Sequence, residues 1–161
     1  MWKQLTQKAR KAIFLAQEEA GRLGYSHVGS EHLLLALVRE EDCVAASILE
    51  RLGLDLGSIR IEIMSHLSKG QEVLGDDMQL NGDAKAVIDL AFAEGRRMKD
   101  DWIGTEHLLI GLARGKSCLA AKVLTRMGAR PAEIRRQLRQ LHAGTLPFEH
   151  VETSTSVASV A

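Results

Sequence analysis

Hydrophobic residues recur at every third or fourth position near the start of the chain, which predicts an amphipathic helix between Thr6 and Gly24. Thr6 suits the N-cap, and Gly24 suits a left-handed residue beyond the C-terminal end. The next segment, from Glu31 to about Glu40, is apolar on all faces, so we expect a buried central helix. Asp42 and Asp55 are the expected N-caps of a third and a fourth helix.

The whole pattern occurs twice. The segment GSEHLLLAL begins at Gly29 and GTEHLLIGL begins at Gly104, so the shift between the copies is 104 − 29 = 75 residues. Ser30 is the expected cap of the central helix in the first copy. In the second copy, the expected caps and the proline suited to a first helical position are Asn81, Thr105, Ser117 and Pro131. The pattern predicts an all-α fold in which each copy contributes four helices.

The two copies cover residues 5–67 and 80–142, so we expect one double-repeat domain over residues 1–142. Residues 68–79 are polar with two glycines and are typical of a linker or exposed loop. Residues 143–161 lose the helical periodicity and are rich in Ser, Thr and small residues, which predicts a mobile C-terminal tail.

Charge and composition exclude several classes of function. The chain of 161 residues carries 21 Lys and Arg against 21 Asp and Glu, so no global field favours nucleic acid or an anionic membrane. No segment approaches the roughly twenty apolar residues that cross a bilayer. The two cysteines, Cys43 and Cys118, lie at equivalent positions without ligand spacing, so we expect buried packing residues and a reducing, cytoplasmic setting.

The chain also lacks the short motifs that place catalytic groups. It has no GxxxxGK[ST] phosphate loop, no GxGxxG fingerprint and no GxSxG elbow. We therefore expect no catalytic residues, no metal ligands and no cofactor, and a protein that is not an enzyme.

A Glu-His pair begins the second helix of each copy, as Glu31-His32 and Glu106-His107. Each glutamate falls in the first helical turn, where the helix dipole stabilises a carboxylate by about 0.3 to 1 kcal/mol. Neither histidine has an HxxxH, HExxH or cysteine partner, so we favour structural histidines over a zinc site.

Differences between the copies indicate which positions face outward. Phe14 corresponds to Asp89, and Phe92 corresponds to Gln17. We expect both phenylalanines to be at least partly solvent-facing, or to contact a neighbouring part of the chain or a partner. Single exposed apolar residues without a function remain the simpler alternative.

The two copies resemble the N-terminal repeat of Clp-type AAA+ unfoldases, with the ClpC-type domain as the nearest match. The resemblance rests on the helix motif A-x-x-A-x-x-x-A-x-x-E-A of the first copy and on G-[ST]-E-H-[IL]-L-x-[GA]-L, which occurs in both copies. It implies a pseudo-twofold pair of four-helix repeats that binds protein substrates or adaptors for a Clp ATPase or protease. A regulator that competes with the unfoldase for substrates or small-molecule ligands is the alternative.

The resemblance further implies recognition of phosphoarginine on substrate proteins. Each site would combine a first-turn glutamate with a cap residue and a cation of the preceding helix: Glu31 with Thr6 and Arg10, and Glu106 with Asn81 and Lys85. A carboxylate would hold the guanidinium, and a helix end or a cation would hold the phosphate. The alternative is that the two glutamates only stabilise helix ends.

The charges near the two sites differ in sequence. Basic residues of the first copy are Lys3, Lys8, Arg10 and Lys11, whereas acidic residues near the second are Asp76, Asp77, Asp100 and Asp101. We therefore hypothesise unequal sites, of which the first binds anionic groups better.

Overall fold

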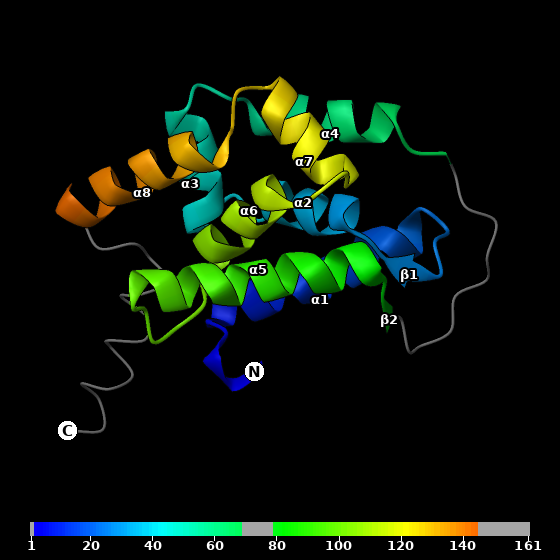
Figure 1. The fold of residues 1–161 in the computed structure, drawn as a ribbon. Helices are drawn as coiled ribbons and strands as arrows, with labels where there is room; N and C mark the ends of the chain where they lie inside the picture. The colour runs from blue at the N-terminus through cyan, green and yellow to red at the C-terminus, as the bar shows by residue number, and fades with distance from the viewer. Residues whose placement is uncertain (1, 69–78, 145–161) are drawn as a thin grey trace.

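The computed structural model describes residues 2–68 and 79–144, and these ranges consist mainly of helices (Figure 1). In the first repeat the elements are η1 (Trp2–Gln4), α1 (Gln7–Arg22), β1 (His27–Val28), α2 (Ser30–Arg39), α3 (Val44–Arg51) and α4 (Leu56–Ser65). In the second they are β2 (Gln79–Leu80), α5 (Gly82–Met98), α6 (Thr105–Arg114), α7 (Leu119–Arg126) and α8 (Pro131–Gly144). The all-α prediction is confirmed. The predicted linker and tail lie almost entirely outside the described residues.

Three predicted N-caps use their own side chains to accept the first unpaired helical N–H groups. Thr6 accepts from the Ala9 N–H at 3.1 Å, and Asn81 accepts from the Ala84 N–H at 2.9 Å. Asp55 begins α4 in the same way. These interactions span three residues, so local sequence is enough to predict them.

Four other caps were predicted one residue too late or too early. The caps expected at Ser30, Asp42, Thr105 and Ser117 are instead Gly29, Cys43, Gly104 and Cys118. The side chain of Thr105 is used elsewhere, because its hydroxyl accepts the Ala45 N–H at the start of α3 at 3.1 Å. A contact between the repeats has therefore replaced a local one.

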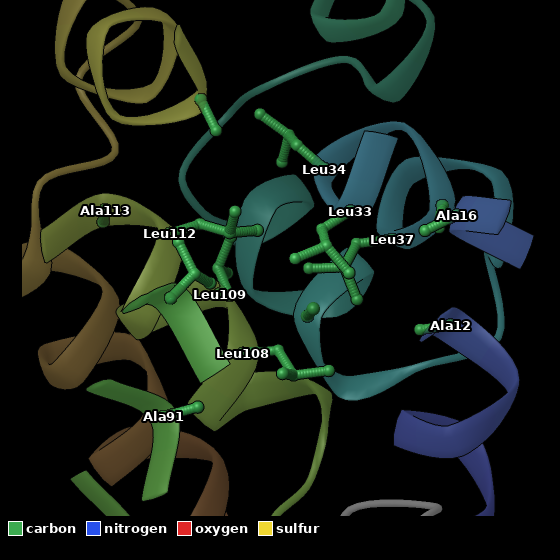
Figure 2. Packing of buried hydrophobic residues seen from close by; sticks show 14 of the residues in the cluster. Ala12, Ala16, Leu33, Leu34, Leu37, Ala91, Leu108, Leu109, Leu112 and Ala113 are labelled. Atoms are coloured by element: carbon green, nitrogen blue, oxygen red, sulfur yellow. The ribbon is translucent and has the colours of Figure 1, made fainter. Parts of the chain in front are cut away.

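Helices α2 and α6 form the centre of the fold. Figure 1 shows them between α1 and α5 on one side and α3, α4, α7 and α8 on the other. Residues 33–38 of α2 are all buried, as the apolar run predicts. In Figure 2 leucines of α2 and α6 lie together in the core. Cys43 and Cys118 are buried against the same core, as expected.

The segment before the first helix of each repeat pairs with the other repeat. Val28 pairs with Leu80 in a short parallel ladder, and Leu5 forms a parallel bridge with Ile103. Leu80 is the counterpart of Leu5, and Ile103 is the counterpart of Val28. Each repeat thus begins by pairing with the other one, as a pseudo-twofold axis requires.

A second symmetric pair of contacts joins the outer helices. Arg51 of α3 donates to the Gln137 side chain of α8 at 3.0 Å, and its counterpart Arg126 of α7 donates to Glu62 of α4 at 2.7 Å. Gln137 is itself the counterpart of Glu62. The outer helices of the two repeats are thus joined by an equivalent pair of contacts.

Candidate functional site

The start of α2 is held by a histidine rather than by a serine. The ring Nδ1 of His32 accepts the N–H of the N-cap Gly29 at 2.9 Å, which is the role that a Glu or Gln side chain has in a capping box. The backbone N–H can only donate, so the ring proton lies on Nε2. Burial lowers the pKa of His32, although the charges of Glu31 and Glu19 act in the opposite direction. The ring is therefore neutral at pH 7.

The start of α6 repeats this contact and adds another. Nδ1 of His107 accepts the Gly104 N–H at 3.0 Å, and Nε2 lies 2.8 Å from a carboxylate oxygen of Asp100. The counterpart of Asp100 is Tyr25, whose ring lies edge-on to that of His32 with centroids 4.9 Å apart. Both histidines thus hold the start of their helix, and they differ in that the His107 ring also contacts a carboxylate whereas the His32 ring contacts Tyr25.

The two glutamates fold back over the N-cap glycines. A Cβ at Gly29 would lie 2.6 Å from a carboxylate oxygen of Glu31, and a Cβ at Gly104 would lie 2.8 Å from the carboxyl carbon of Glu106. The carboxylate in each copy thus takes the space that a side chain at the glycine of G-[ST]-E-H would fill. The glutamates differ in access: 17% of the Glu31 side chain is exposed, and none of Glu106.

The structure brings each cap residue to the other repeat's glutamate segment. The Thr6 N–H donates to the Ile103 carbonyl at 3.0 Å, three residues before Glu106. The Asn81 N–H donates to the Val28 carbonyl at 2.8 Å, three residues before Glu31. The grouping within each copy that the resemblance implied is thus crossed in the fold: the start of α1 lies beside the segment before α6, and the start of α5 beside the segment before α2.

A family model, the Clp repeat (R) N-terminal domain, matches residues 4–125. The chain belongs to this family. Among curated relatives, it is 41% identical over 141 residues to the negative regulator of genetic competence ClpC/MecB from Bacillus subtilis strain 168, covering 88% of this chain and 17% of that protein. It is 40% identical over 138 residues to the chloroplastic ClpA homolog of Brassica napus, an ATP-dependent Clp protease ATP-binding subunit, covering 86% and 16%. The chain spans about one sixth of the length of these relatives.

Solved structures of Clp N-domains have the same fold. The N-terminal domain of ClpD from Arabidopsis thaliana superposes with a TM-score of 0.68 at 25% identity, covering 88% of this chain and 97% of that one. A ClpV N-domain in complex with a VipB peptide has a TM-score of 0.70 at 15% identity, covering 84% and 85%. Among the described helices of this Clp-repeat chain, none is long and apolar enough to cross a membrane.

The basic residues that distinguish the first Clp repeat are partly neutralised. Nζ of Lys11 lies 2.7 Å from a carboxylate oxygen of Glu40, and Nζ of Lys8 lies 3.1 Å from the other. Burial opposes ionisation of Glu40, but the hydrogen bonds from Lys11 and Lys8 prevail and lower its pKa. Arg10 and Lys85 are exposed, one at the start of α1 and one at the start of α5. Lys3 is also exposed, so the first repeat has more exposed cations near its leading cap than the second.

The acidic residues attributed to the second site are also not equivalent. Asp100 contacts His107, whereas Asp101 is exposed. Asp76 and Asp77 lie outside the described residues. Among the described residues of this set, Asp101 is thus the exposed carboxylate.

The two phenylalanines have different environments. Phe14 is 59% exposed on α1, which confirms the expectation for this residue. Phe92 is only 7% exposed and packs in the core, so of the alternatives expected for it the structure has the contact with another part of this chain and not exposure to solvent. Its counterpart Gln17 is half-buried, at the edge of the core face, where a phenylalanine ring turns inward. The two rings therefore form no common apolar surface.

Sequence reasoning missed a buried acidic residue in each Clp repeat. Glu19 on α1 and its counterpart Glu94 on α5 are 1% and 0% exposed, and both contact arginines of the following helices. A glutamate within the apolar stripe of both copies, with arginines shared at Arg39 and Arg114, was the available signal. Buried carboxylates need such partners, because an unpaired buried charge is strongly unfavourable.

Proposed function

We propose that this domain is a non-catalytic binding module that receives protein substrates or adaptors for a Clp unfoldase. The family match and the relatives support this, since the relatives include an ATP-binding subunit of a Clp protease, and a domain of the same fold is seen with a bound peptide. The cytoplasmic setting stays a prediction, and a regulator that uses the same sites to compete with the unfoldase remains the alternative.

We infer that phosphoarginine side chains of substrate proteins bind at the N-terminal ends of α2 and α6. The observation that carries this proposal is the carboxylate that lies over the N-cap glycine, next to the leading helix of the other repeat. A guanidinium pairs well with such a carboxylate, and a phosphate is stabilised by helical N–H groups and a nearby cation. In the crossed arrangement the sites consist of Glu31 with Asn81 and Lys85, and of Glu106 with Thr6 and Arg10.

The two sites differ in how readily a ligand reaches them. Glu31 is partly exposed, so a guanidinium can contact it without a change of rotamer. Glu106 is enclosed, and its carboxylate must turn outward before it binds. Side-chain rearrangement of a buried charge reduces the net binding free energy. The Glu31 site is therefore the stronger one.

Titration of a phosphoarginine peptide tests both statements. Loss of one charge-assisted hydrogen-bond acceptor costs about 1.5 to 3 kcal/mol, so Glu31→Ala weakens binding roughly 10- to 150-fold. Glu106→Ala has a smaller effect. The control is Glu133→Ala, which removes an exposed carboxylate of α8 that pairs with Arg136, and it leaves the affinity unchanged.

Three results would count against the proposal. If the wild type binds the unmodified arginine peptide equally well, the phosphate has no role. If it binds neither peptide, phosphoarginine is not the ligand. Equal losses from Glu31→Ala and Glu106→Ala would contradict only the inequality of the sites.

A further inference from the structure

A pocket of about 420 Å³ opens in the second repeat between α5 and the turn that joins α6 to α7. Its apolar lining includes Val87, Leu90 and Cys118, of which Val87 and Cys118 are buried in the core. The volume lies within the range of small-ligand pockets, roughly 300 to 1,000 Å³. None of these residues belongs to the sites at the helix starts.

The corresponding space in the first repeat is bridged by ion pairs. Three residues around the pocket and their first-repeat counterparts are Asp83 and Lys8, Ala86 and Lys11, and Gly115 and Glu40. Because Lys8 and Lys11 both contact Glu40, long side chains cross from α1 to the end of α2. In the second repeat these side chains are replaced by shorter ones. The pocket is a specific product of the divergence between the copies.

One end of the pocket has an excess of positive charge. Arg114 lies 3.0 Å from Glu94, but Arg97 and Arg135 contact the same carboxylate, so three guanidinium groups share one negative charge. Lys116 is exposed at the same rim. Its ammonium group adds to the positive charge at this end of the pocket.

The first repeat balances the corresponding charges. Arg39 contacts Glu18 at 2.9 Å, and the counterpart of Glu18 is Ala93. Glu41 stands where the second repeat has Lys116. At the Arg114 end of the pocket the second repeat thus has Ala93 and Lys116 where the first has Glu18 and Glu41.

The opposite rim is acidic. Asp83 and Asp89 lie on α5 and line the pocket across from the turn that carries Lys116. A carboxylate entering from this side is repelled, whereas one at the Arg114 end is attracted. The pocket thus favours a ligand that has an apolar group and an anionic group next to it, in one orientation.

We propose that this pocket binds the C-terminal residue of a polypeptide whose last side chain is apolar. The terminal carboxylate pairs with Arg114 and Lys116, and the side chain packs on Val87 and Leu90. A terminal residue is the simplest polypeptide group that joins a carboxylate to an apolar side chain within a few ångströms. The site is separate from the phosphoarginine sites and provides a second way to hold a substrate.

A peptide that ends in leucine tests the proposal, measured by titration against the whole chain and compared with the same peptide carrying a C-terminal amide. Loss of a charge-assisted interaction at a partly exposed site weakens binding by roughly tenfold, so we expect that loss for the amide. Lys116→Glu causes a similar loss for the free acid and no further loss for the amide. Arg139→Glu makes the same change in charge at an exposed position of α8 and leaves both affinities unchanged.

Backbone NMR separates this site from the proposed function. The free-acid peptide shifts amide signals of residues 83–90 and 114–118, and the shifts persist in the Glu31→Ala/Glu106→Ala variant. A phosphoarginine peptide keeps its affinity for Lys116→Glu. Equal affinity for acid and amide, or unchanged binding by Lys116→Glu, would overturn the C-terminal site without affecting the phosphoarginine proposal.

Discussion

The first repeat and the second repeat bury a glutamate at the same position but surround it with different charges. Arg60 holds Glu19 in the first repeat with two hydrogen bonds of 3.1 and 3.0 Å, and Arg39 is shared between Glu19 and Glu18. In the second repeat Glu94 alone balances three arginines. The contacts that join α1 to α2 and α4 are thus preserved as contacts that join α5 to α6 and α8.

This difference shows which parts of a duplicated unit are constrained. The buried carboxylate and the two arginines that reach it connect three helices, so both copies keep them. The carboxylates outside the core are exposed, and exposed charges contribute little to stability. They are free to diverge. In this chain their divergence redistributes the charges around a pocket and leaves the buried carboxylate with its arginines in place.

The largest expected effect comes from removing the buried carboxylates. Glu94→Gln leaves three arginines without their shared anion, and breaking a buried ion pair costs up to about 3 to 5 kcal/mol. We expect about 2 to 3 kcal/mol, because the arginine side chains are 24% to 59% exposed and regain water. Glu19→Gln costs less, about 1 to 2 kcal/mol, since Arg39 retains Glu18.

Urea unfolding of the two variants measures these losses in the free energy of unfolding, with the exposed Glu133→Gln as the control.

The pH dependence of the free energy of unfolding gives a further test of the Glu94 contacts. Burial alone would raise the pKa of Glu94, but hydrogen bonds from Arg135 and Arg97 outweigh it and lower the pKa. Its contribution to stability is complete above the unfolded-state pKa of about 4.3 and is lost as the pH falls below that value. A larger loss for Glu19→Gln would contradict the role of the unbalanced arginines.

The second effect concerns the glycines at the helix starts. Gly104→Ala places a methyl group against the enclosed Glu106 carboxylate, and we expect a loss of about 1 to 2 kcal/mol from overpacking. Gly29→Ala costs less than about 1 kcal/mol, because the partly exposed Glu31 side chain can move aside. Both glycines have negative φ angles, so backbone strain does not contribute.

Thermal unfolding of each glycine variant with and without Glu→Ala at the neighbouring glutamate isolates the clash. Glu106→Ala should restore part of the stability lost in Gly104→Ala. If the glycine substitution costs the same with and without the glutamate, the carboxylate is not the reason for glycine at this position.

The smallest effect comes from His32. Burial lowers its pKa, so the folded state binds its proton less readily than the unfolded state does. The free energy of unfolding contributed by this group is complete above the unfolded-state pKa of about 6.5 and decreases as the pH falls below it. Protonation would also place a hydrogen on Nδ1 and break the bond from the Gly29 N–H.

His32→Gln keeps a side-chain acceptor but does not titrate, so we expect it to lose less stability than the wild type between pH 7 and pH 5.5. Urea unfolding at both pH values measures the difference. An identical pH dependence for the two proteins would show that the neutral ring is not required at this position.

The proposed phosphoarginine sites also depend partly on local sequence and partly on tertiary structure. The sequence motif placed Glu31 and Glu106 in the first turns of α2 and α6, and the structure has both there. The residues that lie beside them could not be assigned correctly, since Thr6 and Asn81 reach them only through pairing between the repeats. The resemblance assigned each glutamate the cap residue of its own copy, whereas the pairing between the repeats places the cap residue of the other copy beside it.

Periodicity, capping residues and duplication in the sequence alone determined the helices and their number, because these depend on interactions within a few residues. Only the tertiary structure decided that Phe92 turns inward, that Glu19 and Glu94 anchor arginine clusters, and that a pocket opens in one repeat. The physical reason is that burial and charge balance depend on side chains from several helices at once. Two copies with matching helical patterns can therefore present different surfaces.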